Sequence, residues 1–231
     1  MYFFKTLILS LFFMIFSTAT YAQNTQKYMV DFVPIIINEN GYELIIYVSS
    51  DYVKSTNNNG YRIPYGVNQA FELANAYDST LPTTKIVDII YQRSDLKLKP
   101  SPMNPTSQMS SLDYILRHNK TIEDQIAGRK FNLLAGHKKD VVLSNRGISN
   151  PNRVAIYGWH QLNGKPIQPL STVHGKDYYD YSHGVRLVKR DCTLNNKPCD
   201  IVNILKDPKI APLISYEGQI KNVERFILNF M

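Results

Sequence analysis

The segment from Arg153 to Val188 holds the side chains of this chain that are best suited to chemistry. It contains three of the five histidines and the only tryptophan, with carboxylate, hydroxyl and guanidinium groups between them. Histidine is the side chain whose charge changes most readily near neutral pH, which suits it to proton transfer. The catalytic candidates in this segment are His174, Asp180, Ser182, His183 and Arg186.

Two catalytic mechanisms fit these residues. In the first, a histidine is the general acid or base, Asp180 orients it, and Arg186 stabilises an oxyanion or binds a substrate carboxylate. In the second, Ser182 is a nucleophile. Because His183 would point away from Ser182 on a strand, His174 or His160 would have to be its base. We rank acid–base catalysis first and the serine mechanism last.

Two further interpretations lie between these. A zinc site would take its ligands from His160, His174, His183 and Asp180, which are suitable types. Their spacing lacks the H-E-x-x-H pattern that places two histidines on one face of a helix, so we expect no metal and no cofactor. The other interpretation, ranked second, is a polar network of tyrosines and histidines that only holds a long loop in place.

Substrate-binding candidates come from two neighbouring motifs. Gly136-His137-Lys138-Lys139-Asp140 lies between two apolar runs, and its positive groups could bind an anion; a solvated basic turn is the alternative. In Tyr157-Gly158-Trp159-His160 the two aromatic rings could form a platform for a sugar ring or a peptide, and the glycine allows a sharp bend. The candidates are His137, Lys138, Tyr157, Trp159 and His160.

The run Ser182-His183-Gly184-Val185-Arg186-Leu187 resembles a motif of the L,D-transpeptidases, Ser-His-Gly-Cys-x-Arg. In that family a His-Gly pair precedes this motif, as His174-Gly175 does here. The likeness covers about a dozen residues and departs at the nucleophilic cysteine, which this chain lacks. The resemblance therefore implies a cell-wall substrate and does not imply cysteine transpeptidation.

The N-terminal residues 1–22 have the pattern of a secretory signal peptide. Lys5 is the positive residue, Leu7 to Phe16 is apolar except for Ser10, and small residues precede the expected cleavage after Ala22. The apolar run is shorter than the roughly 20 residues that span a bilayer. We expect a secreted or periplasmic protein of residues 23–231, with no stable membrane insertion after the signal is cleaved.

Cys192 and Cys199 are the only cysteines. Two cysteines in an exported chain, with Asn195, Asn196 and Pro198 between them, predict a disulfide that closes a small turn. The polar, turn-like surroundings argue against a nucleophilic cysteine.

The chain has a formal net charge of +7, which falls to +6 without Lys5. This excess could favour an anionic surface such as a cell-wall polymer, or could equally reflect a composition rich in asparagine and lysine. No dense basic run with interleaved aromatic residues is present, so nucleic acid is not an expected partner.

The elements that must position these candidates read as a single α+β domain. Residues 28–37 and 42–50 predict a hairpin, and residues 66–77, 83–90 and 111–127 predict helices, the second capped by Thr83 and the third by Ser110 or Ser111. His118 lies on the apolar stripe of the third helix with Leu112, Ile115, Ile122 and Ile126, so it is a reserve candidate. Short strands are predicted after residue 128, at residues 131–135, 141–144, 153–157 and 185–189, and residues 215–231 predict a last helix. We expect helices from the N-terminal half packed on a mainly antiparallel sheet, with the site in residues 136–188.

The function that these patterns favour is an exported enzyme, a hydrolase or transferase, that acts on a glycan or peptide of the cell envelope by histidine acid–base chemistry. The alternative is a secreted module without catalysis that binds carbohydrate or protein through Trp159 and the tyrosines. Convergence of His137, His160, His174 and His183 on one cleft would favour the enzyme.

Overall fold

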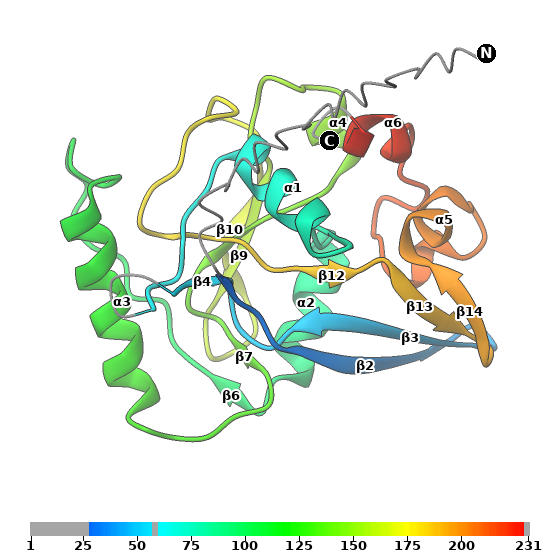
Figure 1. Cartoon of the computed structure of the whole chain (residues 1–231), viewed down its shortest axis with the longest axis horizontal. Coiled ribbons are helices and arrows are strands. Elements are labelled where there is room, and N and C mark those ends of the chain that lie inside the picture. The colour runs from blue at the N-terminus through cyan, green and yellow to red at the C-terminus, as the bar shows by residue number, and fades with distance from the viewer. Residues whose placement is uncertain (1–27, 57–59, 229–231) are drawn as a thin grey trace, which may run out of the picture.

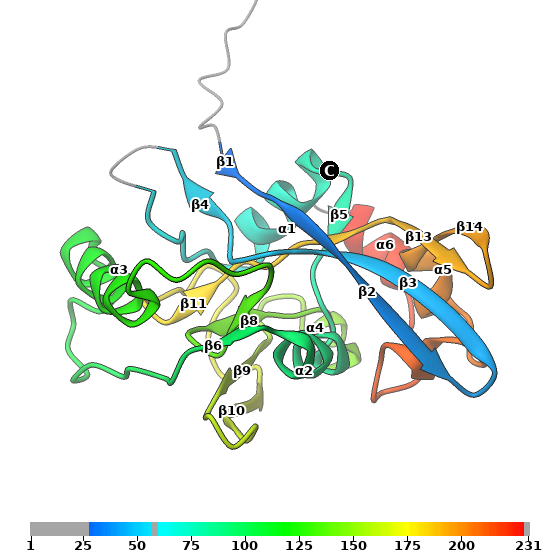
Figure 2. The same cartoon turned by 90° about the horizontal axis from the view of Figure 1, so that it is seen from below.

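A long hairpin of β2 (Phe32–Glu39) and β3 (Tyr42–Ser49) crosses the molecule and curves along its length (Figures 1 and 2). The computed structural model describes residues 28–56 and 60–228, so the predicted signal peptide lies outside the described residues. Asn40 and Gly41 both have positive φ, as a two-residue hairpin turn requires, and the strands pair from Phe32–Ser49 to Glu39–Tyr42. The predicted hairpin is confirmed.

The hairpin belongs to the larger sheet, in which β3 is the central strand. Its order is β14 (Lys197–Asp200), β13 (Asp191–Leu194), β3, β12 (Val188–Lys189) and β5 (Ser79–Thr80), with β2 also on β3, and every pairing is antiparallel. One hydrophobic core joins this sheet to α1 (Val67–Ala76), α5 (Ile201–Lys206), the short 3₁₀ turn Ala211–Leu213 and α6 (Val223–Leu228).

The smaller sheet carries most of the candidate residues. Its order is β10 (Pro166–Ser171), β9 (Ile156–His160), β8 (Lys139–Val141) and β11 (His183–Gly184). β11 runs parallel to β8, whereas β9 is antiparallel to both of its neighbours. The helix α2 (Thr84–Arg93) lies beside β9, and the short helix α4 (Asn145–Ile148) follows β8 (Figure 2).

The remaining elements are two pairs of short strands and the third helix. β1 (Tyr28–Met29) pairs with β4 (Lys54–Ser55), and β6 (Leu96–Lys97) pairs with β7 (Leu134–Ala135). Between β6 and β7 the chain forms α3 (Leu112–Ile126), whose N-cap is Ser111, as predicted. Thr83 caps α2 by accepting a hydrogen bond from the Ile86 N–H, which is also as predicted. The α+β fold class is confirmed.

Several boundaries differ from the sequence prediction. The strand expected at residues 153–157 is β9 and begins at Ile156, and the strand expected at residues 185–189 is interrupted between β11 and β12. Leu112 is 47% exposed, so it is not part of the buried stripe of α3, whereas Tyr114 is buried in its place. The first turn of α3 therefore faces the core through Tyr114 and not through Leu112.

Prolines occur in three strands, and each of these strands lies at the edge of its sheet. Pro34 lies in β2, Pro198 in β14, and Pro166 and Pro169 in β10. Proline has no N–H for a ladder hydrogen bond, so an edge is where a strand tolerates it, and it also discourages pairing with another chain.

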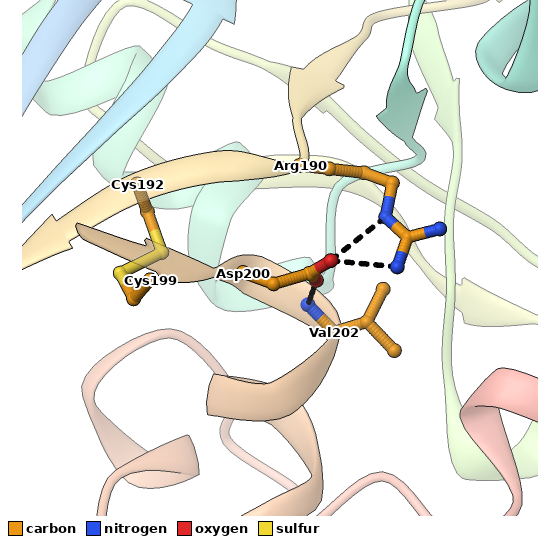
Figure 3. The surroundings of a disulfide bond; sticks show 5 residues. All are labelled: Arg190, Cys192, Cys199, Asp200 and Val202. Carbon is orange, nitrogen blue, oxygen red and sulfur yellow. Dashed lines mark hydrogen bonds and ion pairs between the residues drawn. A yellow bond between two sulfur atoms is a disulfide. The ribbon is translucent and has the colours of Figure 1, made fainter.

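The predicted disulfide is present between Cys192 and Cys199, which are cross-strand partners of the β13–β14 hairpin with their Cα atoms 4.9 Å apart (Figure 3). Asn195 and Asn196 form its turn with positive φ. Beside it, Arg190 pairs with Asp200, which also caps α5 through the Val202 N–H (Figure 3). The disulfide is compatible with an oxidising compartment. Within residues 28–56 and 60–228, no helix has the length and apolar character needed to cross a bilayer.

Candidate functional site

An irregularity in β9 decides where its side chains go. Gly158 has φ +108° and Trp159 has φ +57°, so the strand does not alternate regularly at this point. Tyr157 and His160 therefore contact the same side of the sheet, with ring centroids 5.9 Å apart, while Trp159 lies with Tyr181 on the other side. The proposed aromatic platform of Tyr157 and Trp159 is not formed, because the two positive φ angles separate the rings.

On the side of the sheet that carries Tyr157 and His160, the carboxylate of Asp88 in α2 accepts hydrogen bonds from three side chains. His160 Nε2 lies 2.8 Å from Asp88 Oδ1, the Tyr157 hydroxyl lies 3.0 Å from the same oxygen, and the Tyr216 hydroxyl donates to Oδ2 at 3.0 Å. A carboxylate only accepts hydrogen bonds, so His160 Nε2 carries the proton of this bond. Burial, followed by the negative charge of Asp88, raises the pKa of Tyr157, so its hydroxyl stays protonated and remains a donor.

This arrangement borders a pocket of about 350 Å³. His160 is only 3% exposed, and its ring stacks on Tyr91 with centroids 4.6 Å apart. Lys97 Nζ lies 5.5 Å from the centroid of the Tyr91 ring and donates to the carbonyl of Ser94. The lining residues come from α2, β6 and the β9–β10 turn: Asp88, Tyr91, Gln92, Lys97, His160, Leu162, Asn163 and Gly164. We call this group the Asp88 pocket.

The absence of a side chain at Gly158 allows Val87 of α2 and the side chain of Asp140 to lie close to the backbone of β9. A Cβ at this position would lie 3.2 Å from Val87 Cγ1, 3.3 Å from Asp140 Oδ2 and 3.6 Å from His160 Cε1. Its positive φ also excludes most other residues. The bend that the sequence predicted at Gly158 is therefore present. Its backbone lies close both to His160, which borders the Asp88 pocket, and to the buried Asp140.

His137 lies in the interior and not in a solvated loop. Its Nε2 is 3.1 Å from Asp51 Oδ1, and Arg62 holds both oxygens of the same carboxylate, at 3.0 and 2.6 Å. Burial alone would raise the pKa of Asp51, but Arg62 and His137 hold it well below its usual range. Burial lowers the pKa of His137 to about 4, against the effect of Asp51. His137 thus belongs to a structural ion-pair network.

Lys138 also points inward and is fully buried. Its ammonium donates to the Tyr181 carbonyl at 2.6 Å. Burial lowers its pKa to about 7. Both side chains are buried, so neither His137 nor Lys138 is on the surface where the predicted anion-binding role would need them.

Arg186 connects strands of three different sheets: β3 of the larger sheet, β7 of the β6–β7 pair and β8 of the smaller sheet. Its guanidinium donates to the carbonyls of Ser49 and Leu134, at 2.6 and 2.8 Å, and lies 3.7 Å from Asp140 Oδ1. The Tyr52 hydroxyl donates to Asp140 Oδ2 at 2.8 Å. Burial nevertheless raises the pKa of Asp140 to about 6, against the effects of Arg186 and Tyr52.

The other catalytic candidates form a separate group around Asp180. Ser182 Oγ donates to Asp180 Oδ1 at 2.5 Å, and the Tyr178 hydroxyl donates to Oδ2 at 3.2 Å. His174 stacks on Tyr178 with centroids 4.0 Å apart. His183 is fully buried, neither of its ring nitrogens has a partner among the described residues, and burial lowers its pKa to about 4. Ser182 is therefore held by a carboxylate and not by a histidine.

A cluster of aromatic rings lies on the far side of β9 from Asp88. It consists of Tyr114, His118, Trp159 and Tyr181, and we call it the aromatic cluster. The indole Nε1 of Trp159 is buried without a hydrogen-bond partner among the described residues. An unpaired buried polar group of this kind costs about 1 to 3 kcal/mol. Burial lowers the pKa of His118 to about 2, so its ring is neutral.

The histidines do not converge on one cleft, so the arrangement that would favour an enzyme over a binding module is not present. His137 meets Asp51, His160 meets Asp88, His174 meets Tyr178, and His183 is buried. Asp88 was not among the candidates from the sequence, because it lies 72 residues from its partner His160 with no spacing signal between them.

No group of three His, Cys, Asp or Glu side chains that could hold a metal ion occurs in the part of the chain that the structure describes. The expectation of no cofactor stays a prediction. Comparison of the chain with models of known protein families, with curated proteins and with solved structures finds no match. The resemblance to the L,D-transpeptidase motif therefore rests on its own few residues.

Proposed function

We propose that the protein is an exported hydrolase or transferase that uses His160 as general acid and base on a polymer of the cell envelope. The observation that carries this proposal is the 2.8 Å hydrogen bond between His160 Nε2 and Asp88 Oδ1 at the edge of an open pocket. Asp88 orients the imidazole and stabilises its charged form, as the carboxylate does in other histidine–aspartate pairs.

In this mechanism Nδ1 of His160 removes a proton from a water molecule or a substrate hydroxyl as it attacks, and then returns the proton to the leaving group. No serine, threonine or cysteine is among the described lining residues of the Asp88 pocket, so the nucleophile is water or an acceptor hydroxyl. Water gives hydrolysis, and a substrate hydroxyl gives transfer. Tyr157 and Tyr216 hold the carboxylate in place and limit how His160 rotates.

The substrate class is supported by other features. A signal-like N-terminus, a disulfide and a positive net charge (+7 for the whole chain, +6 without Lys5 of the predicted signal) are compatible with an extracytoplasmic protein that meets anionic polymers. The pocket offers polar side chains of Gln92, Lys97 and Asn163, which suit a glycan or peptide more than a lipid.

The test is digestion of purified sacculi by residues 23–231, with the soluble products identified by mass spectrometry. Addition of a chelator in a parallel sample tests for a metal requirement. We expect release of defined fragments, and loss of that release in His160→Gln. His174→Gln is the matched control, because His174 is half-buried and contacts only Tyr178 among the described rings.

Equal activity of His160→Gln and the unsubstituted protein would remove His160 from the mechanism. Loss of activity in His174→Gln alone would move the site to the Asp180 group. No release from sacculi or from isolated envelope glycans and peptides would contradict the proposed substrate class.

A further inference from the structure

Lys97 is a positively charged side chain that the fold holds in place at the Asp88 pocket. Its ammonium donates to the carbonyl of Ser94 at 2.7 Å and to that of Gln92 at 3.4 Å. It also lies 5.5 Å from the centroid of the Tyr91 ring, whose face attracts a cation. An ammonium has three N–H groups, so at least one remains for a partner outside these contacts. Lys97 is therefore a positioned donor that the protein itself does not saturate.

Lys97 forms no ion pair among the described residues, although it is partly buried. Asp88, which lines the same pocket, accepts hydrogen bonds from three other side chains. Asp95, two positions before Lys97, accepts from backbone N–H groups of the segment before β7. By contrast, the partly buried Lys85 pairs with Glu39 at 2.9 Å. The charge of Lys97 is thus available to an anionic group of a ligand.

Tyr91 holds this ammonium and the imidazole of His160 around one aromatic ring. His160 stacks on Tyr91 with ring centroids 4.6 Å apart. Tyr91 itself is 5% exposed, and its hydroxyl donates to the Gln161 carbonyl at 2.6 Å, so its position is fixed. The pocket of about 350 Å³ has room for a small ligand unit. A unit that reaches His160 therefore also lies within reach of Lys97.

Leu162 adds an apolar surface to the same pocket. It lies in the β9–β10 turn and is 63% exposed. The turn is held by hydrogen bonds from the Gln161 N–H to the Lys165 carbonyl and from the Gly164 N–H to the Gln161 carbonyl. Covering apolar surface of this kind with a methyl group is favourable. The pocket therefore suits a ligand that carries a small apolar group beside a negative charge.

We propose that Lys97 is the specificity-determining residue of the Asp88 pocket, and that it binds a carboxylate carried by the polymer unit on which His160 acts. The carboxylate accepts a charge-assisted hydrogen bond from the remaining N–H of Lys97, and a methyl group beside it packs on Leu162. A lactyl ether on a sugar and a C-terminal alanine both have this chemistry. The inference rests on the Asp88 pocket as the site of the proposed function, but it concerns binding and is tested without turnover.

The test is an NMR titration of residues 23–231 with two matched pairs of soluble probes. The reporter is the imidazole Cε1–H signal of His160, assigned from its loss in His160→Gln. One pair is N-acetylmuramic acid and N-acetylglucosamine, which differ by the lactyl ether. The other is N-acetyl-alanyl-alanine and its C-terminal amide. We expect the acid of at least one pair to bind about tenfold more tightly than its neutral partner. The pair that shows this preference identifies the source of the carboxylate.

Lys97→Gln removes the charge, so we expect the preference for the acid to be lost. Lys99→Gln is the matched control, because it makes the same change in an exposed side chain two positions away and should keep the preference. The preference of the unsubstituted protein should also weaken as salt is raised, which tests the charge without a variant.

Equal affinity for acid and neutral probe in both pairs would overturn the inference, as would a His160 signal that neither acid shifts. An unchanged preference in Lys97→Gln, or equal losses in Lys97→Gln and Lys99→Gln, would overturn it as well. None of these results bears on the digestion of sacculi and its dependence on His160. Conversely, a preference lost only in Lys97→Gln, in a protein that releases nothing from sacculi, would support the carboxylate site and contradict the proposed function.

Discussion

The two sides of β9 hold histidines that are almost equally buried and yet differ in every other respect. His160, 3% exposed, meets a carboxylate that fixes its tautomer, and it borders a pocket. His118, 0% exposed, packs against the rings of Trp159 and Tyr181. The difference teaches that burial alone does not select a candidate histidine. The proposed role of His160 depends on the carboxylate that orients its ring and on the neighbouring pocket, whereas the surroundings of His118 are those of a packed core.

The prediction with the largest expected effect concerns the activity of a variant at Asp88, the partner of His160. Asp88→Asn keeps the size of the side chain but replaces an acceptor oxygen with an amide, which can favour the wrong tautomer of His160 and cannot stabilise its charge. We expect activity on the envelope substrate to fall about 10²- to 10⁴-fold while the folded structure is retained. Steady-state kinetics and circular dichroism check this together. Full activity in Asp88→Asn would make the pair a structural feature.

The second prediction concerns the pH dependence of the free energy of unfolding, which depends on the buried histidines. The pKa values of His118, His137 and His183 are lowered to about 2, 4 and 4. The unfolded chain therefore binds more protons than the folded one below pH 6.5, and stability is lost as the pH falls. Between pH 7 and 5 each histidine should remove about 2 kcal/mol from the free energy of unfolding.

Asp140 acts in the opposite sense in the same range, because its pKa is raised to about 6. Its folded form binds a proton that the unfolded form does not, so it restores about 1 kcal/mol on going to pH 5. We expect a net loss of about 4 kcal/mol, measured by urea unfolding at each pH. The loss should be smaller by about 2 kcal/mol in His118→Leu. A flat profile would mean that the buried histidines have partners when folded.

A third effect distinguishes the two His-Gly pairs. A Cβ on Gly184 would lie 2.4 Å from Cδ1 of Tyr52, which is buried and bonded to Asp140, whereas nothing lies within 4 Å of a Cβ on Gly175. Gly184→Ala should lower the free energy of unfolding by about 3 kcal/mol, and Gly175→Ala should leave it nearly unchanged. Chemical denaturation measures both. Similar values for the two variants would contradict the tight packing around β11.

The smallest effect belongs to a region outside both sides of β9. The Cys192–Cys199 bridge closes a short hairpin, so replacing both cysteines with serine should lower the free energy of unfolding by about 2 kcal/mol. Emission from Trp159 and activity should not change. Thiol titration of the denatured protein from its native compartment should find no free thiol. Two titratable thiols there would remove the disulfide.

The local parts of this fold were predictable because short-range chemistry determines them. Asn40-Gly41 forms a tight turn in almost any setting, and Thr83 and Ser111 cap helices with their own hydroxyls. The prediction for Leu112 was wrong because an aromatic residue of the same turn, Tyr114, faces the core instead, and an apolar pattern does not distinguish the two. His137 and Arg186 were predicted to contact substrate. In the structure both lie in the interior, where each binds groups that are far away in the sequence.

The sequence by itself determined the fold class, the hairpin, the helix caps, the cysteine pair and the segment in which unusual polar residues gather. Each depends on residues within a few positions of one another, or on composition. Only the tertiary structure decided which histidine meets a carboxylate beside a pocket. That choice depends on the packing of α2 against β9 and on positive φ angles at Gly158 and Trp159, which separate Tyr157 from Trp159 and bring Asp88 to His160 across 72 residues. Contacts over such a separation come from packing of the whole chain, which no local pattern encodes.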